Sequence, residues 1–377
     1  MALLDRRRRY GKVKTLGHLR LKAITSGTFT FTIPAAIGTN YITSISYSTD
    51  NGASWVTVNN TSEEVVITTP TIPAGSGVLW KGIATGISTG SAVSKFSSTA
   101  SFDASGNIMS LLYGDAFEGK LTLSSYTFKG LFQNSRIVNA NDLLIPATTL
   151  ANNCYQYMFY YCRSLTTAPV LPATTMAKYC YDSMFQGCTS LTTAPTLSAT
   201  TLANNCYQYM FQDCTSLTTA PTLSATTLAH YCYAYMFRYC TSLNTAPVLP
   251  ATTMKNYCYA SMFQGCTSLT TAPTLSATTL ANYCYAGMFS GCTSLTMAPV
   301  LPARTLVSYC YATMFNGCTS LSYIKAMFTT SPATSYTNAW VTNVKSTGTF
   351  VKNSAATWNV TGVNGIPSGW TVRTASS

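Results

Sequence analysis

The sequence predicts an α/β repeat solenoid of seven 26-residue coils, preceded by a small all-β, sandwich-like module and closed by atypical β end caps. Three observations predict this fold. The 14 cysteines fall into two series, and both series advance in steps of 26 residues. Tyrosine, methionine, phenylalanine and leucine recur at fixed places around them. Upstream of the repeats, short segments alternate apolar and polar residues as half-buried strands do.

The length of 377 residues suggests two or three folding units, and the patterns divide the chain into five segments. These are a basic N-terminal arm (1–22), a β-sandwich-like module (23–105), an N-terminal solenoid cap (106–150), the solenoid (151–325) and a C-terminal β cap (326–377). Only 8% of the residues are charged, so the surface is polar but largely uncharged. No run approaches the roughly 18 consecutive apolar residues of a membrane span, so membrane insertion is not expected.

The N-terminal arm carries much of the positive charge. Eight bases stand against Asp5 alone in the first 22 residues, which gives +7 of the total +12. Such an arm can dock on nucleic acid, anionic lipid or an acidic protein socket, or remain a solvated tail. The candidate docking residues are Arg6, Arg7, Arg8, Arg9, Lys12 and Lys14. The apolar residues here are scattered among bases, so we do not expect a secretory signal peptide.

The β module is expected to contain strands at 27–33, 64–69, 77–81 and 95–102. Residues 46–58 predict a hairpin, because Asn51-Gly52 suits a turn that requires positive φ. The motif Ser48-x-Asp50-x-Gly52-x-Ser54-Trp55 resembles the Asp-box hairpin of sialidase propellers and other β proteins. That resemblance implies a folding element and no catalytic residue.

The repeat reads C-Y-x-x-M-F-x-x-C-x-S-L-x-x-A-P, with A-P lost in the last copy, and its physical pattern predicts one helix, one turn and one short strand. Cys206, Met210 and Cys214 are spaced at i, i+4 and i+8, which places them on one face of a helix. The following L-T-T-A-P segment predicts a strand that Pro221 keeps short. Stacked coils then repeat at about 4.8 Å on the strand side.

The cysteines are expected to be reduced core residues rather than ligands. A separation of eight residues along a helix is about 12 Å, too far for a disulfide within one coil. Disulfides between neighbouring coils remain an alternative, although seven cysteines in a column leave one unpaired. The spacing does not match a zinc site, and no metal or other cofactor is expected.

The full unit M-F-x-x-C-T-S-L-T-x-A-P-x-L-P-A-T-T-L resembles the BspA-like leucine-rich repeats of bacterial surface proteins and of phages that infect gut bacteria. The flanking segments N-I-M-S-L-L-Y-G-D (107–115), G-T-F-V-K-N (348–353) and G-I-P-S-G-W-T-V (365–372) resemble the same group. The resemblance covers about residues 20–377. It implies a right-handed solenoid with a role in attachment to host glycoproteins, matrix proteins or other cells, and it carries no catalytic residues.

The leading functional hypothesis is a non-enzymatic attachment protein: a phage virion fibre or appendage, made in the host cytoplasm, that displays the solenoid to a bacterial surface. The basic arm would contact other virion proteins, and the solenoid a bacterial surface glycan or protein. A homo-oligomer, a trimer by analogy with other fibres, is compatible with this. A bacterial cell-surface adhesin is the alternative. A glycan-active enzyme is a remote third, because the repeats contain only two carboxylates, Asp182 and Asp213.

Two groups of outward residues are candidates for a receptor-binding surface. Tyrosines on the expected helix side add aromatic area where the copies differ, and tyrosine is common at recognition surfaces. Threonine rows on the expected strand side form a hydroxyl-rich face. The candidates are Tyr157, Tyr160, Tyr161, Tyr209, Tyr235, Thr192, Thr193, Thr218 and Thr219. An ordinary solvated surface is the competing interpretation of both groups.

Overall fold

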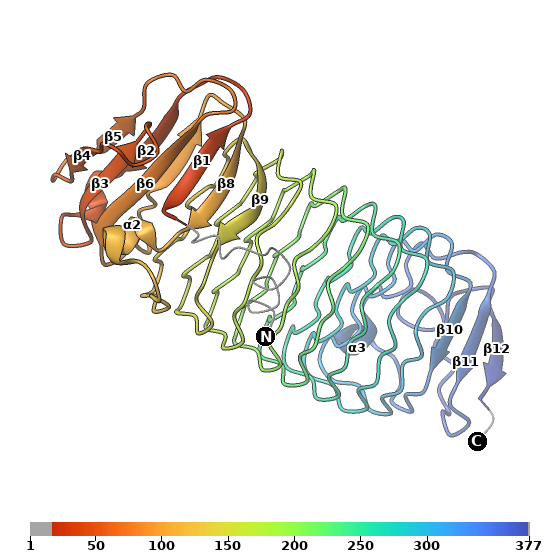
Figure 1. The fold of residues 1–377 in the computed structure, drawn as a ribbon. Coiled ribbons are helices and arrows are strands. Elements are labelled where there is room, and N and C mark those ends of the chain that lie inside the picture. Colours follow the sequence, from red (N-terminus) through yellow and green to blue (C-terminus); the bar gives the residue numbers. More distant parts are fainter. Residues whose placement is uncertain (1–16, 376–377) are drawn as a thin grey trace, which may run out of the picture.

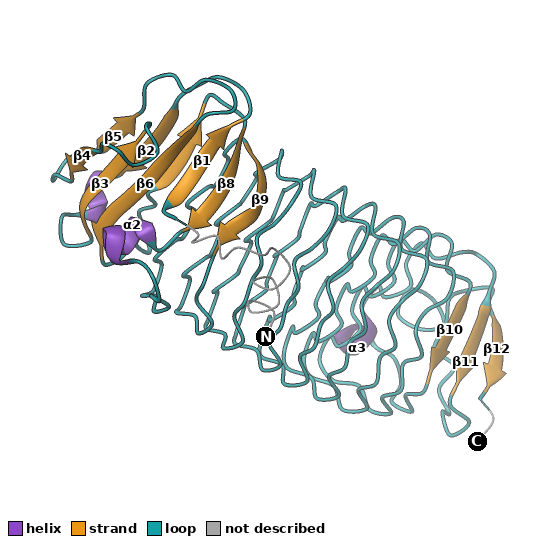
Figure 2. Ribbon diagram, in the orientation of Figure 1, coloured by secondary structure: helices purple, strands orange, loops and turns teal. Residues whose placement is uncertain are grey.

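A computed structural model describes residues 17–375 of the chain. A β module stands at one end, a long stack of coils follows, and a small parallel sheet closes the other end (Figure 1). The coils consist almost entirely of turns and loops, as the colouring in Figure 2 makes plain. The 26-residue period of buried cysteine and aromatic residues is confirmed.

The N-terminal module contains two sheets whose aromatic side chains meet. Phe31 on one sheet lies 6.4 Å from Trp80 on the other, measured between ring centroids, and Phe29 lies 5.3 Å from Phe102. The six-stranded sheet has the order β4-β3-β6-β1-β8-β9, and the three-stranded sheet has the order β5-β2-β7. The strands are β1 (Leu19–Ala23), β2 (Phe29–Ile33), β3 (Ile42–Ser48), β4 (Val56–Asn59), β5 (Val65–Thr68), β6 (Gly77–Ala84), β7 (Lys95–Ser98), β8 (Phe102–Asn107) and β9 (Ile137–Leu144).

Two boundaries expected from the sequence differ in the structure. The arm was expected to run to residue 22, but β1 begins at Leu19, because Leu19, Leu21 and Ala23 alternate inward between β6 and β8. The single strand expected over 95–102 is two strands in different sheets. The hydroxyl of Ser98 accepts from the amide of Ala100 at 2.9 Å and turns the chain between β7 and β8.

The hairpin between β3 and β4 has the geometry that its motif predicts. Asn51 and Gly52 both have positive φ, 57° and 92°. The carboxylate of Asp50 accepts from the amide of Ser54 at 2.9 Å and from the hydroxyl of Ser48 at 2.7 Å. Hydrogen bonds from Ser54 and Ser48 hold the pKa of Asp50 well below its usual value. The motif therefore ties the turn together.

The segment between the two cysteines of each coil is a run of tight turns, so the prediction of a helix there is wrong. In the first coil, the amide of Met158 donates to the carbonyl of Tyr155, three residues back, at 3.2 Å. The next amide, of Phe159, donates across to Met184 of the following coil at 2.9 Å. An α-helix would send both amides to carbonyls four residues back. We call residues 154–162 and their equivalents the turn segments, and we number the coils 1–7 from Cys154.

Positive φ angles explain why the spacing imitated a helix. The φ angles of Asn153, Tyr157 and Tyr161 are 58°, 60° and 53°. Every coil has positive φ at the three equivalent positions. A turn repeat of four residues points positions i, i+4 and i+8 the same way, as a helix nearly does. The third of these positions is glycine in four coils: Gly187, Gly265, Gly291 and Gly317.

Identical side chains stack from coil to coil in the core. The phenylalanine column repeats with ring centroids 5.4–5.8 Å apart from Phe159 to Phe315. All 14 cysteines are buried free thiols. The second thiol of each coil donates to a phenylalanine carbonyl of the preceding coil, as Cys188 does to Phe159 at 3.1 Å. Burial raises the pKa of the Cys162 thiol to about 12, which keeps it protonated.

One hydrogen-bonded ladder joins the β module to the coils. β9 pairs in parallel with β8, and Asn139 of β9 forms a parallel bridge with Thr167 of coil 1. Bridges between threonines continue the ladder as far as Thr271. The strand expected in each coil is thus a single bridge residue, and one alanine separates it from the proline that limits pairing. The ladder widens again at β10 (Tyr323–Ala326), β11 (Thr349–Lys352) and β12 (Thr371–Thr374).

The turn segments also extend beyond the seven coils at both ends. Upstream, the amide of Phe128 donates to Cys154 at 2.8 Å, and Ser135 stands beside Cys162 where a cysteine would otherwise lie. Downstream, the amide of Phe315 donates to Trp340, whose buried indole lies at the methionine position. These segments cover the two ends of the core with residues other than cysteine.

Helix is scarce in this fold. The α-helices are α2 (Ser110–Tyr113) and α3 (Thr334–Thr337), and the 3-10 turns are η1 (Ala35–Ile37) and η2 (Gly114–Ala116). No helix within residues 17–375 has the length and apolar character needed to cross a membrane. The α/β class expected from the sequence is therefore corrected to a solenoid of turns and β-bridges with little helix.

Gly291 allows the turn structure to be tested against the helix. A Cβ added at Gly291 would lie 3.6 Å from Gly265, an ordinary contact, so substitution probes the backbone alone. At its φ of 74°, Gly291→Ala should lower the free energy of unfolding by about 1 kcal/mol. In a helix the same change would raise it by about 1 kcal/mol. Urea denaturation measures the sign, and Gly291→Asn should cost less, because asparagine tolerates positive φ.

Candidate binding surface

Two outward columns of the turn segments differ from coil to coil. One begins at Tyr157 and continues with Ser183, Tyr209 and Tyr235, while the other begins at Tyr160 and continues with Gln186, Gln212 and Arg238. The residues between them point inward and are nearly invariant. We call the surface formed by these two columns the turn face. Its backbone is the hydrogen-bonded turn framework described above, so variable side chains stand on a constant support.

The turn face contains an open hollow of about 340 Å³ over coils 1–4 and the cap coil before them. Its walls carry phenol, amide and guanidinium groups. This volume is at the lower end of the range for small-molecule sites. The lining residues are Gln133, Tyr157, Tyr160, Ser183, Gln186, Tyr209, Gln212 and Arg238.

The hollow lies where the first column lacks an aromatic ring. Ser183 occupies that position, only 2% exposed, between Tyr157 of coil 1 and Tyr209 of coil 3. Where two tyrosines are adjacent in this column, at 209 and 235, their rings stack with centroids 4.7 Å apart. The serine therefore forms part of the floor of a gap with a tyrosine on each side.

Arg238 is the one cation in the lining. Its guanidinium lies 4.7 Å from the Tyr239 ring centroid and 5.7 Å from that of Tyr235, and it donates to the Tyr239 hydroxyl at 3.1 Å. Within the described part of the chain, no carboxylate lies within ion-pair distance of it. Its Nε is buried and has no hydrogen-bond partner, and the same is true of Oε1 of Gln212. The wall thus holds unused donors and acceptors.

Asp182 lies next to the floor serine and is 4% exposed. One carboxylate oxygen accepts from the Gln156 amide at 2.8 Å. Burial raises the pKa of Asp182 to about 7, although hydrogen bonds from Gln156 and Ser183 oppose this change. Asp182 is therefore largely protonated below neutral pH and contributes little negative charge to the hollow there.

The candidate tyrosines and threonines lie on different parts of the coil. Tyr157, Tyr160 and Tyr209 line the hollow, Tyr161 packs edge-on against Tyr160 at 4.5 Å, and Tyr235 stacks on Tyr209. The structure thus gathers the five tyrosines around one hollow. The threonines Thr192, Thr193, Thr218 and Thr219 are exposed on or beside the bridge ladder, and none lines the hollow.

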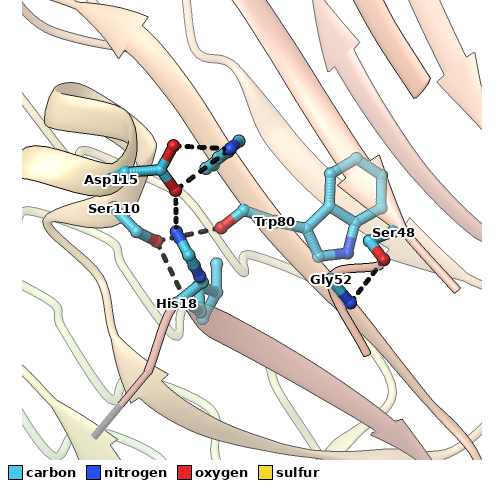
Figure 3. A network of polar contacts seen from close by, with 8 residues as sticks. His18, Ser48, Gly52, Trp80, Ser110 and Asp115 are labelled. Carbon is cyan, nitrogen blue, oxygen red and sulfur yellow. Dashed lines mark hydrogen bonds and ion pairs between the residues drawn. The ribbon is translucent and has the colours of Figure 1, made fainter. Parts of the chain in front are cut away.

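The docking residues proposed in the arm, Arg6, Arg7, Arg8, Arg9, Lys12 and Lys14, lie outside the described residues. The chain enters the β module through a polar network (Figure 3). Nε2 of His18 and Nζ of Lys81 both lie 2.8 Å from the Asp115 carboxylate, and hydrogen bonds from Lys81 and His18 lower the pKa of Asp115. Ser110 links the Leu19 amide to the Trp80 carbonyl. The network anchors β1 where the arm joins it.

Sequence reasoning found the tyrosines but missed the polar part of the hollow. Gln133, Ser183, Gln186 and Arg238 were not singled out, because the emphasis lay on aromatic residues at the variable outward positions. Aligning the copies by their 26-residue period shows that Ser183 shares the column of Tyr209, and that Gln186 and Arg238 share the column of Tyr160. No group of three or more histidine, cysteine or acidic residues is positioned to hold a metal within the range the structure covers.

Comparison with protein families supports the repeat assignment. A family model described as the BspA type leucine rich repeat region matches residues 152–296 and 233–347, in six copies. Together the two matches span more than half of the chain. No curated protein and no solved structure matches it.

Asp182 predicts a dependence of stability on pH. Its pKa is raised from 3.8 to about 7 in the folded chain, so the folded state binds the proton more tightly than the unfolded state. The stabilising contribution of Asp182 should therefore be fully present below about pH 4 and be lost as the pH rises to about 7, by up to about 4 kcal/mol for a shift of about three pKa units.

Thermal unfolding of Asp182→Asn at several pH values measures this effect. The variant should lose the decline between pH 4 and 7 and unfold at a higher temperature than the natural chain at pH 8. Asp213→Asn is the matched control, because Asp213 is only half-buried, and it should keep the decline. A natural chain whose stability rises over this range would contradict the assignment.

Proposed function

The chain belongs to the family with BspA-type leucine-rich repeats, and from this premise we propose that it is a non-enzymatic binding protein. In this proposal, the turn face contacts a macromolecule on a cell surface. A surface or binding role is consistent with the repeat family. The coils act as a rigid frame, and the partner is recognised by the side chains that differ among them.

The observation that carries the proposal is the division of each turn segment into constant inward and variable outward positions. Alternate amides bond to the next coil, which fixes the spacing of the outward columns. Tyrosine, glutamine and arginine fill the two columns around the hollow, and aromatic residues and arginine are enriched in binding surfaces. Three of the five candidate tyrosines line the hollow, and the other two pack against them.

The composition of the hollow supports binding rather than catalysis. No carboxylate lines it. General acid–base hydrolysis of a glycan uses two positioned carboxylates on either side of the scissile bond. Of the two acidic residues in the repeats, Asp182 is buried and Asp213 accepts a hydrogen bond from Gln212 at 3.0 Å. Neither is presented to a substrate in the hollow.

Binding of the labelled full chain to intact bacterial cells tests the proposed surface. Changing Tyr157, Tyr209 and Tyr235 to alanine should weaken binding at least about tenfold, because aromatic anchors dominate such interfaces. Thr193, Thr219 and Thr245, changed together to alanine, form the matched control on the bridge ladder and should leave binding unchanged. The opposite result would place the partner on the ladder, and a folded chain that binds no cell or matrix surface would refute the function.

The setting that we propose is a virion, in which the chain is a fibre or appendage for attachment to a bacterial surface; the alternative is a bacterial cell-surface adhesin. The concentration of seven net positive charges in the first 22 residues supports a docking role for the N-terminal segment. The order of the segments is compatible with this, since the β module separates the basic segment from the solenoid.

Removal of residues 1–16 tests the docking role without touching β1, which begins at Leu19. The shortened chain should keep its thermal unfolding temperature and be absent from particles purified from the producing lysate, as measured by mass spectrometry. Replacing Arg6–Arg9 with alanine should also reduce the amount of the chain in the particles. Normal incorporation of both variants would exclude the docking role, and recovery of the natural chain only on bacterial cells would favour the adhesin.

A further inference from the structure

We infer that the hollow between Tyr157 and Tyr209 binds one ring of an acidic glycan, a sugar whose carboxylate pairs with Arg238. The inference rests on the proposed function, because it names the chemistry that the turn face recognises. It commits to a carbohydrate and not to a protein segment. The reasons are the shape of the gap, the polar groups around it and its single cation.

The gap has the form needed to hold a ring. Two tyrosines two coils apart flank Ser183, and the column places tyrosine at the same position in coils 1, 3 and 4. Ser183 is 2% exposed, hydrogen-bonds the Asp182 carboxylate and closes the floor of the gap. Sugar rings present apolar C–H faces that pack on aromatic side chains, so a ring seated here contacts the flanking tyrosines.

The amides around the gap suit a ligand with many hydroxyl groups. Gln133, Gln186 and Gln212 come from three different coils and line the same hollow. Each amide can donate and accept, as each sugar hydroxyl can. Oε1 of Gln212 is buried without a partner, and it gains a hydrogen bond if the side chain rotates toward a polar ligand.

Arg238 supplies the charge selectivity. Tyr235 and Tyr239 hold its guanidinium in place, and no described carboxylate neutralises it. No acidic side chain lines the hollow itself, and the nearby Asp213 carboxylate accepts a hydrogen bond from Gln212. Guanidinium groups bind carboxylates through two parallel hydrogen bonds, which the terminal Nη groups of Arg238 can donate. A neutral sugar would leave this cation unpaired, so the arrangement favours an acidic one.

Oligogalacturonate and the same oligosaccharide after reduction of its carboxylates form a matched pair of probes for calorimetry on the full chain. The natural chain should bind the acid and bind the reduced sugar at least about tenfold more weakly. Arg238→Gln should weaken binding of the acid by about 10- to 100-fold, the effect of one lost charge-assisted hydrogen-bonding group. The variant should then bind the acidic and the reduced oligosaccharide with equal affinity. Sialyllactose and lactose provide a second pair with a different acidic sugar.

Ser183→Tyr tests the gap itself. Tyrosine already occupies this column in neighbouring coils at nearly the same φ, 53° at Ser183 and 55° at Tyr209, so the backbone accepts it. The new ring should fill the hollow and abolish binding of every probe while the unfolding temperature stays near that of the natural chain. Ser261→Tyr, in the same column of coil 5 with φ of 51°, is the matched control and should bind normally.

The outcomes separate the inference from the function it rests on. Equal binding of acidic and neutral probes, or an Arg238→Gln variant that binds as the natural chain does, would overturn carboxylate recognition. Absence of binding to all four sugars by a chain that still binds cells through its tyrosines would overturn the glycan site and point to a protein partner. Absence of binding to sugars and cells alike would overturn the proposed function as well.

Discussion

The whole solenoid depends on how the amides of the turn segments divide their hydrogen bonds. One amide closes a turn within its own coil, and the next reaches the neighbouring coil, as Met158 and Phe159 do. A turn by itself is too short to be stable, since it buries little surface and its cross-coil amides lack partners. Stacking satisfies these amides and buries the phenylalanine and methionine columns at once, so local structure and core formation are one event.

This arrangement also explains how strain is tolerated. Tyrosine is an uncommon residue at positive φ, yet Tyr157, Tyr209 and Tyr235 all adopt it. A left-handed residue costs about 1–2 kcal/mol. The cross-coil hydrogen bond made by the same residue and the stacking of adjacent rings offset that cost. The conformation also sets these side chains on the outside of the coil, where they form the turn face.

The period, the core residues and the β module could be predicted from the sequence, because repetition and alternation report directly on burial. The local conformation of the repeat could not, since the spacing of Cys206, Met210 and Cys214 fits a helix and a run of four-residue turns equally well. The column that holds Gly187 and Gly291 contained the deciding signal, as glycine is unfavourable inside a helix. The hollow was predicted only in its tyrosines. Arg238 and Ser183 belong to different coils, and their meeting follows from the turn geometry and not from any local motif.

The bridges and the cross-coil hydrogen bonds of the turn segments make the coils interchangeable in their backbone bonding but not in their surface chemistry. Duplication or loss of a whole 26-residue unit at coils 5–7 would change the length of the molecule and leave the hollow complete. The same event among coils 1–4 would divide it, since its walls come from the cap coil and four successive units. A change in repeat number at coils 5–7 would therefore alter the reach of the molecule without altering the hollow.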